Sequence, residues 1–273
     1  MIVAIDTGGT KTLIAGYNER GAITTQYKFE TPKKPSEYID TLLTHLTALF
    51  GDKKITALSL AVPGIVRNGV AVHCPNLGWN NFPIVRELKS ALGPKLPIFL
   101  ENDANLAGLA EARSFRTIPD SCLYVTISTG IGSGIIIDGK IDRGLANSEA
   151  GHALIEYDGV VREWESFASG QAVYKTYKKM AKDIKSKRTW MQIADRISRG
   201  FLAVIPILQP NVIVIGGSMG SHFEKYELFL NEKLKKHLPD MIAVPKIVQA
   251  KHPEEAVVYG CYYHALDQLA AKA

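Results

Sequence analysis

A buried strand, a glycine-rich turn and a second strand follow one another twice in this chain, and this pattern limits the possible folds most strongly. It reads "IVAI-DTGGTK-TLIAG" from residue 2 and "LYVTI-STGIGSG-IIID" from residue 123. In both places a short apolar run bounded by turn residues predicts a buried strand. The repetition suggests two related lobes, each with a glycine turn. A third apolar run, "NVIVI", also leads into glycines, "GGSMG", at residues 216–220.

The other segments alternate between strands and helices, which predicts a mainly α/β fold. Further strands are expected at residues 55–62, 97–100 and 246–250, and helices at 36–50, 82–93, 104–115, 189–208, 223–237 and 254–271. The segment "PNLGWNNFP", residues 75–83, is expected to be a loop. A chain of 273 residues can form one large domain or two of ordinary size.

The formal net charge of +5 suits an anionic ligand without requiring nucleic acid. In the most basic run, "KTYKKMAKDIKSKR" at residues 175–188, the lysines recur at near-helical spacing. This spacing favours a solvated helix face over a nucleic-acid patch, which typically interleaves aromatic residues.

Three scattered cysteines, Cys74, Cys122 and Cys261, form neither a disulfide framework nor a paired-cysteine metal motif, and they suit a reducing cytoplasm. The chain opens directly on an apolar strand, so we expect no signal peptide. It contains no apolar run long enough to cross a membrane.

The glycine turns indicate phosphate binding, because glycine lets backbone N–H groups approach phosphate oxygens. Ligands of α/β sheets bind at the carboxyl ends of strands, where all three turns are expected. The spacing of a Walker loop is absent, and the dinucleotide pattern G-x-G-x-x-G is not matched convincingly. Asp6, at the end of the first strand, either holds a hydrated Mg²⁺ or stabilises the turn.

The segment "LENDAN", residues 100–105, places Glu101, Asn102 and Asp103 where a strand meets an alanine-rich helix. Asn or Asp at such a junction caps the helix by accepting hydrogen bonds from its first N–H groups. A carboxylate at the carboxyl end of a strand also suits catalysis. The residues alone leave both interpretations open.

Taken in order, the motifs of this chain resemble those of the ROK family (repressors, open reading frames and sugar kinases). They are "AIDTGGTK", "VPG" at 62–64, "PNLGW" at 75–79, "ENDAN" at 101–105, "STGIGSG", "EAGH" at 149–152 and "VIGGS" at 214–218, and the resemblance extends from residue 2 to about 265. It implies an actin-like (ribonuclease H-like) ATPase fold with two lobes and a central cleft. Residues 1–115 would form the small lobe, with the C-terminal helix 254–273 packed back on it, and residues 116–253 the large lobe.

The resemblance also implies roles for individual residues. Asp103 would be the general base that accepts the proton of a sugar hydroxyl. The sugar would be bound by Gly64, Asn76, Asn102, Asp103, Glu149, His152 and Glu165. ATP would be bound by Asp6, Gly8, Gly9, Thr10, Lys11, Thr129, Gly130, Gly132, Gly216 and Gly217, with Mg²⁺ at Asp6, directly or through water.

The chain departs from the family pattern after "EAGH". Many members carry a C-x-C-G-x-x-G-C-x-E segment there and bind a structural zinc, whereas residues 151–173 of this chain contain no cysteine. Tetrahedral zinc needs about four N or S ligands, so we predict no zinc. Glu165 matches the last residue of that motif. We expect Trp164, Phe167 and Arg162 to hold His152 and Glu165 instead, by apolar packing and an Arg–carboxylate pair.

The expected activity is ATP-dependent phosphorylation of the 6-hydroxyl of a hexose, with glucose favoured, in a homodimeric cytoplasmic enzyme without nucleic-acid or membrane partners. An N-acetylmannosamine or N-acetylglucosamine kinase and a fructokinase are the alternatives in the same class. A repressor is disfavoured because the first phosphate motif begins at residue 6, which leaves no room for a helix-turn-helix domain. Asp6, Asp103 and the three glycine turns argue against a sugar-binding regulator without catalysis.

Overall fold

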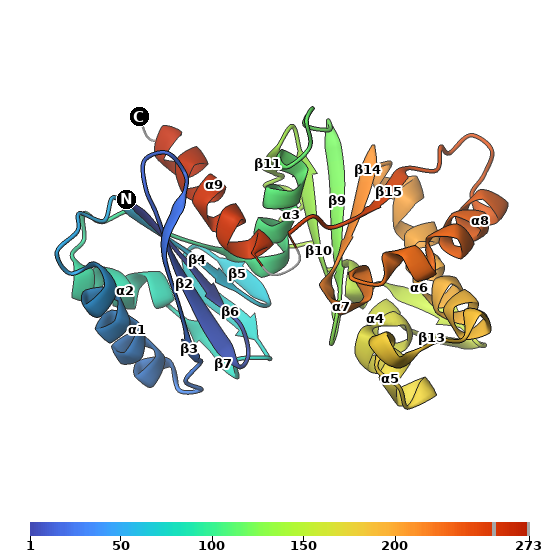
Figure 1. The fold of residues 1–273 in the computed structure, drawn as a ribbon, viewed down its shortest axis with the longest axis horizontal. Coiled ribbons are helices and arrows are strands. Elements are labelled where there is room, and N and C mark those ends of the chain that lie inside the picture. The colour runs from blue at the N-terminus through green and yellow to red at the C-terminus, as the bar shows by residue number, and fades with distance from the viewer. Residues whose placement is uncertain (253–254, 272–273) are drawn as a thin grey trace. The chain divides into compact units, whose positions relative to one another are not determined.

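The computed structural model describes residues 1–252 and 255–271. They form two compact units, and Figure 1 traces the chain through them by colour. The N-terminal unit comprises residues 1–110 and the described C-terminal residues 255–271, and the central unit comprises residues 111–252. Residues 253, 254, 272 and 273, on which the ends of the expected C-terminal helix and large lobe fall, lie outside the described residues.

The N-terminal unit is built on a sheet with the strand order β3-β2-β1-β4-β8. Its strands are β1 (Ile2–Thr7), β2 (Lys11–Tyr17), β3 (Ile23–Glu30), β4 (Ala57–Val62) and β8 (Ile98–Asn102). The strands β1, β4 and β8 run parallel to one another, and β2 pairs antiparallel with both β1 and β3. The carboxyl ends of β1, β4 and β8 therefore meet at one edge of the sheet.

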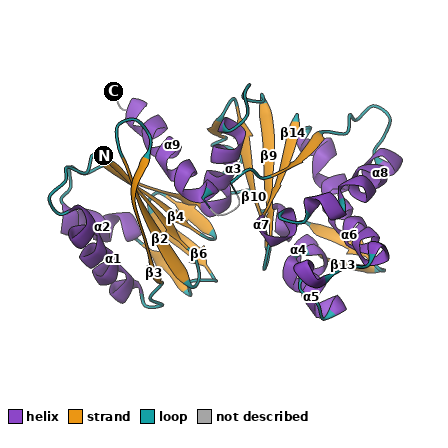
Figure 2. Ribbon diagram, viewed as in Figure 1, coloured by secondary structure: helices purple, strands orange, loops and turns teal. Residues whose placement is uncertain are grey.

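Helices cover this sheet because their apolar residues recur at helical spacing. In α1 (Pro35–Phe50) the buried side chains are Tyr38, Leu42, Leu46 and Phe50, and these pack with strands β1 and β4 and helix α2 (Ile84–Leu92) in one core. In Figures 1 and 2, helices α3 (Asp103–Arg113) and α9 (Ala256–Ala270) lie on the other side of the sheet from α1 and α2. The close contact of Gly260 in α9 with the Leu106 backbone joins these two helices.

A small antiparallel sheet, β5-β6-β7, completes the N-terminal unit. Its strands are β5 (Ile65–Arg67), β6 (Val70–Cys74) and β7 (Trp79–Phe82). The expectation of a loop over residues 75–83 is wrong for its second half. Trp79 and Phe82 enter the core while Asn80 and Asn81 stay exposed, and the Trp79 Nε1–H donates to the Lys33 carbonyl at 3.0 Å. Burial of the two aromatic side chains outweighs the turn preference of the asparagines.

The central unit is built on a sheet with the strand order β11-β10-β9-β14-β15. Its strands are β9 (Ser121–Ile127), β10 (Ile131–Ile137), β11 (Lys140–Ile141), β14 (Val212–Gly216) and β15 (Lys246–Gln249). Strands β9, β14 and β15 are parallel. The core lies against α6 (Lys187–Leu208), α8 (Glu227–His237), α4 (Trp164–Ala168) and α5 (Gly170–Tyr177). A hairpin of β12 (Leu154–Tyr157) and β13 (Val160–Glu163) leads into α4.

Three expectations for the central unit are corrected. The basic run is not one helix: α5 ends at Tyr177, Lys178 is left-handed (φ 54°), a 3-10 turn η2 (Ala181–Asp183) follows, and α6 begins at Lys187. "GGSMG" is mostly the short helix α7 (Gly217–Gly220). The helix expected at 223–237 divides into a 3-10 turn η3 (Phe223–Lys225) and α8.

None of the helices in the described part of the chain combines the length and apolar character needed to cross a membrane. All three cysteines are free and buried. Burial raises the pKa of the Cys74 thiol to about 11, so this thiol is protonated and unreactive at neutral pH.

Candidate functional site

The three parallel strands of the N-terminal unit deliver the predicted residues to one edge. In the register of the sheet Asp6 of β1 lies opposite Ala61 of β4, and Val62 lies opposite Asn102 of β8. Gly64 lies two residues after the end of β4, and its carbonyl accepts a hydrogen bond from the Asn102 Nδ2 at 2.9 Å. The structure therefore brings Asp6, Gly64, Asn102 and Asp103 to the same end of the sheet, where α/β sheets bind ligands.

The junction of β8 and α3 shows which residue caps the helix. The Asn102 Oδ1 accepts hydrogen bonds from the Ala104 N–H at 2.8 Å and the Asn105 N–H at 3.1 Å. Asp103 is the first residue of α3, and its Oδ1 accepts from the adjacent Ala104 N–H at 2.8 Å. Capping is thus carried mainly by Asn102, and the Asp103 carboxylate sits at the positive end of the helix.

Glu101 supports this junction in a way that sequence reasoning missed. Its Oε1 accepts from the Asn102 N–H at 2.8 Å and from the Asn105 Nδ2 at 2.9 Å. Burial raises the pKa of Glu101, and the two hydrogen bonds oppose the rise. Its carboxylate joins the end of β8 to the first turn of α3 and so positions its two neighbours. Its place between a strand and an N-cap was the only available sequence signal.

The turn between β1 and β2 lies close to Asn76. The Gly8 N–H donates to the Lys11 carbonyl at 3.0 Å, and the Thr31 hydroxyl donates to the Gly8 carbonyl at 2.8 Å. A Cβ at Gly9 would lie 3.0 Å from the Asn76 carbonyl, so this close approach is easiest for glycine. Thr10 and Lys11 are exposed at the turn. Gly9, which is predicted to bind phosphate, and Asn76, which is predicted to bind the sugar, are therefore neighbours.

Asp6 is the most perturbed acid of this edge. Burial raises the pKa of its carboxyl to about 6, and the nearby Lys28 cation partly opposes the rise. A buried carboxylate at the end of a strand offers the oxygen ligands that Mg²⁺ prefers. The site therefore fits a hydrated Mg²⁺.

In the central unit, the β9–β10 turn lies against Glu165. The Ile131 N–H donates to the Glu165 Oε2 at 2.9 Å, and a Cβ at Gly130 would lie 2.4 Å from that oxygen. Gly130 thus makes room for a carboxylate in addition to any phosphate role. Thr129 is exposed at the turn, whereas Gly132 lies within β10, paired with Thr126.

Glu149 and His152 lie beside the same turn. Glu149 precedes the 3-10 turn η1 (Ala150–His152) and His152 is its last residue. Gly151 of this turn packs so closely on β10 that a Cβ would lie 2.1 Å from the Ile131 carbonyl. Burial raises the pKa of Glu149, the nearby His152 lowers it and Glu165 raises it again. The structure therefore gathers Glu149, His152 and Glu165 around the turn that follows β9.

The start of helix α7, which follows β14, lies next to the turn after β9 at the same edge of the sheet. Gly216 lies opposite Thr126 in the parallel pairing of β14 with β9. Gly217 has φ 74°, and a Cβ there would lie 2.6 Å from the Ile127 carbonyl. Only glycine adopts this backbone readily at such close range. The β9–β10 turn and the first residue of α7 therefore share one edge of the sheet.

Glu163 is a second residue that sequence reasoning missed. The His152 Nδ1 lies 3.3 Å from the Glu163 Oε1, and the ligand atoms of His152, Glu163 and Glu165 lie within 4.8 Å of one another. This set offers one nitrogen and two oxygens but no thiolate, so it does not fit the cysteine-rich zinc site of the family pattern. The absence of zinc stays a prediction.

The expected partner of Arg162 is corrected. Its Nη2 lies 3.8 Å from the Asp158 Oδ2 and donates to the Tyr157 carbonyl at 3.2 Å. Arg162 thus pairs within its own hairpin, because the tight turn between β12 and β13 brings Asp158 back over it. The expected packing of Trp164 and Phe167 is confirmed, since both side chains are buried in the core.

Comparison with solved structures shows that the fold is the actin-like ATPase fold of sugar kinases. A ROK family glucokinase from Streptomyces griseus, solved with glucose and AMPPNP, superposes with a TM-score of 0.79 over 97% of this chain and 99% of that chain, at 20% identity. A ROK hexokinase from Thermus thermophilus superposes with a TM-score of 0.77 over 97% of this chain and 99% of that chain, at 26% identity.

The sequence comparisons define the family. The family model of the ROK family matches residues 2–268, and the chain therefore belongs to the ROK family. A Bacillus subtilis protein provisionally named fructokinase is 31% identical over 80% of this chain and 77% of its own length. A Yersinia pestis N-acetylmannosamine kinase is 28% identical over 94% of this chain and 96% of its own length. A Streptomyces coelicolor glucokinase is 29% identical over 66% of this chain and 60% of its own length.

Proposed function

We propose that this protein is an ATP-dependent hexose kinase that transfers the γ-phosphate to the 6-hydroxyl of glucose. The observation that carries the proposal is the junction of β8 and α3. Asn102 accepts the hydrogen bonds of two free N–H groups of the helix, while the next residue presents a carboxylate at the carboxyl edge of the sheet. The named relatives are sugar kinases, which supports a kinase reaction.

In the proposed reaction, Asp103 accepts the proton of the 6-hydroxyl while that oxygen attacks the γ-phosphorus and ADP leaves. Phosphoryl transfer depends mainly on positioning and on stabilising charge. From the N-terminal unit, Gly64, Asn76 and Asn102 would bind the sugar. From the central unit, Glu149, His152 and Glu165 would bind it through hydroxyls that both donate and accept hydrogen bonds.

ATP would be bound through the N–H groups of the glycine turns. The contributing residues would be Gly8, Gly9, Thr10, Lys11, Thr129, Gly130, Gly132, Gly216 and Gly217. Mg²⁺ at Asp6 would offset phosphate charge. Because the pKa of Asp6 is about 6, protons would compete with the cation below that pH. We infer no role for zinc, and we propose that the enzyme is a homodimer.

An N-acetylmannosamine kinase is the second candidate. The relative with that name matches this chain over 96% of its own length, whereas the glucokinase relative matches over 60%. A fructokinase is the third, because the relative with that provisional name is 31% identical. The substrate depends on the shape of the pocket around one or two sugar hydroxyls.

The test is ADP release from ATP and Mg²⁺ with glucose, mannose, fructose, N-acetylglucosamine and N-acetylmannosamine. The position of the phosphate on the product would be determined by ³¹P NMR. The proposal predicts the highest kcat/KM with glucose and a 6-phosphate product. A higher value with an N-acetyl sugar would transfer the assignment to the second candidate. Sugar binding without sugar-stimulated ADP release would contradict the kinase and favour a sugar-binding regulator.

A further inference from the structure

The segment that carries Glu163 and Glu165 begins with a hairpin that has little core of its own. Among the strands of the described residues, β12 and β13 pair only with each other. Leu154, Val160 and Val161 expose 71%, 54% and 65% of their surface. A two-stranded hairpin is at best marginally stable in water. Other contacts must therefore fix the hairpin and the short helix α4 that follows it.

Those contacts form a stack of aromatic rings and guanidinium groups, which we call the Arg–Tyr–Phe stack (Arg162, Arg196, Tyr157 and Phe167). The rings of Tyr157 and Phe167 are parallel, with centroids 4.5 Å apart. The Arg162 guanidinium lies 5.3 Å from the Tyr157 ring and 5.5 Å from the Phe167 ring. Arg196, from α6, lies 5.9 Å from the Tyr157 ring. Cations at these distances attract aromatic rings.

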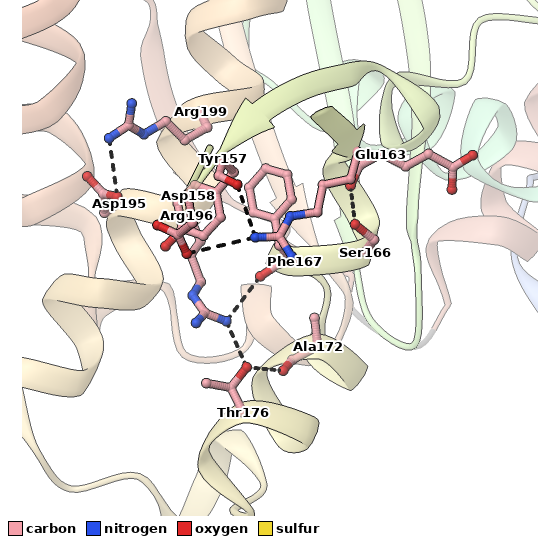
Figure 3. A network of polar contacts seen from close by, with 11 residues as sticks. Tyr157, Asp158, Glu163, Ser166, Phe167, Ala172, Thr176, Asp195, Arg196 and Arg199 are labelled. Carbon is pink, nitrogen blue, oxygen red and sulfur yellow. Dashed lines mark hydrogen bonds and ion pairs between the residues drawn. The ribbon is translucent and has the colours of Figure 1, made fainter. Parts of the chain in front are cut away.

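Hydrogen bonds of Arg196 tie the stack to helices α4 and α5. The Arg196 Nη1 donates to the Phe167 carbonyl at 3.3 Å and to the Thr176 hydroxyl of α5 at 2.9 Å, and these contacts are drawn in Figure 3. Arg196 also fixes α4 through its own backbone, because its carbonyl accepts from the Trp164 Nε1–H at 3.3 Å. One residue of α6 therefore contacts both the beginning and the end of α4.

Glu165 lies between these two anchored residues. Trp164 is fully buried and packs on Gly200 and Phe201 of α6, with its ring 5.3 Å from the Phe201 ring. Phe167 is held by Arg196 and by the stack. Trp164 before it and Phe167 two residues after it are fixed, and the Glu165 side chain points toward the Ile131 N–H and Gly130. Glu163 reaches His152 from the end of β13.

We propose that Arg196 is a positioning residue for the sugar site: through the Arg–Tyr–Phe stack it holds Glu165 and the Glu163–His152 pair in place without a bound metal ion. The inference rests on the proposed function, in which Glu165 and His152 bind the sugar. Arg suits this role better than Lys, because its planar fork both stacks on a ring and reaches two acceptors.

The experiment compares Arg196→Met, Glu165→Gln and the double variant by sugar and ATP kinetics. We expect Arg196→Met to raise the KM for the sugar about tenfold or more, with the KM for ATP changed less than about twofold and the far-UV spectrum unchanged. Because Arg196 acts through Glu165 as well as through the Glu163–His152 pair, the double variant should raise the sugar KM by less than the product of the two single effects. Arg196→Lys should resemble Arg196→Met.

The matched control is Arg199→Met. Arg199 is on the same helix and pairs with Asp195 at 3.5 Å, so its removal should leave both KM values unchanged. Thr176→Val, which removes only the hydroxyl that orients Arg196, serves if Arg196→Met does not fold. It should raise the sugar KM in the same direction.

The outcomes separate the two proposals. If Glu165→Gln leaves the sugar KM unchanged, the proposed sugar role of Glu165 fails. If Glu165→Gln raises it but Arg196→Met and Thr176→Val do not, the positioning role fails. Equal losses for sugar and ATP, or additive losses in the double variant, would also overturn the positioning role. So would stoichiometric metal in the purified protein whose removal by EDTA raises the sugar KM, since His152, Glu163 and Glu165 would then be ordered by an ion.

Discussion

Asp6 provides the sharpest test of the energetics at the carboxyl edge. Its pKa is raised from 3.8 to about 6, chiefly by burial. Each pKa unit corresponds to about 1.4 kcal/mol of difference between the protonated and ionised forms. With Asp6 ionised, the folded protein is therefore destabilised by about 3 kcal/mol relative to a protein with a neutral group there.

The sign follows from the two pKa values. Below pH 3.8 the carboxyl is protonated in the folded and unfolded chains, and folding is not affected. As the pH rises from 3.8 through about 6, the unfolded chain loses its proton first, so stability falls. Asp6→Asn keeps the shape of the side chain and removes the charge. It should stabilise the unliganded protein by up to about 3 kcal/mol at pH 7.5 and by only about 0.6 kcal/mol at pH 4.

The assay is urea unfolding of the wild type and Asp6→Asn at pH 4, 5, 6 and 7.5 without nucleotide or Mg²⁺. Other titrations, such as that of buried His264, cancel in the difference at each pH. Asp52→Asn at an exposed turn is the matched control and should have no effect at any pH. A difference that does not depend on pH, or a destabilised Asp6→Asn protein at pH 7.5, would refute the reasoning.

Three further changes test other parts of the structure. Asn102→Ala removes the cap of α3 and the hydrogen bond to Gly64, so we expect the free energy of unfolding in urea to fall by about 1–2 kcal/mol. An unchanged unfolding midpoint would show that α3 does not need this cap. Gly200→Ala would put a Cβ 2.0 Å from the Trp164 ring; overpacking should cost about 1–3 kcal/mol, and wild-type thermal stability would contradict this packing. Burial lowers the pKa of His264 from 6.5 to about 4, so protonation of this residue in the unfolded chain should reduce stability as the pH falls below 6.5. His264→Gln should lose less stability between pH 7 and 4 than the wild type, and an identical pH profile for the two proteins would contradict the prediction.

The strands next to the glycine turns could be predicted from the sequence because their signals are local. The apolar runs at residues 2–5 and 123–127 lie in β1 and β9, and a turn that contains glycine follows each of them. The second turn is shorter than expected, because β10 already begins at Ile131 and includes Gly132 and Gly134. Local signals also located the junction at residues 100–105. They could not decide between Asn102 and Asp103 as the cap, since both residue types suit it. That choice depends on the Gly64 carbonyl, which only the parallel pairing of β4 with β8 brings near.

The parts that could not be predicted depend on contacts between distant segments. Gly130 was interpreted as a phosphate residue, and nothing in its turn indicates that Glu165 occupies the adjacent space. Arg196 belongs to a long helix with an ordinary amphipathic pattern, and its contacts with Phe167 and Trp164 arise from tertiary packing. The wrong loop assignment at Trp79 has the same cause, because burial of a large ring outweighs local turn propensity.

The role of Asp103 is tested most directly by single-turnover phosphoryl transfer from [γ-³²P]ATP to glucose, with Asp103→Asn beside the wild type. Asp40→Asn, an exposed position on α1, is the matched control. We predict that Asp103→Asn lowers the transfer rate by about 10²–10⁴-fold, while glucose affinity measured by calorimetry changes only a few-fold. Transfer at the wild-type rate in Asp103→Asn, or no glucose-dependent transfer in the wild type, would contradict the account.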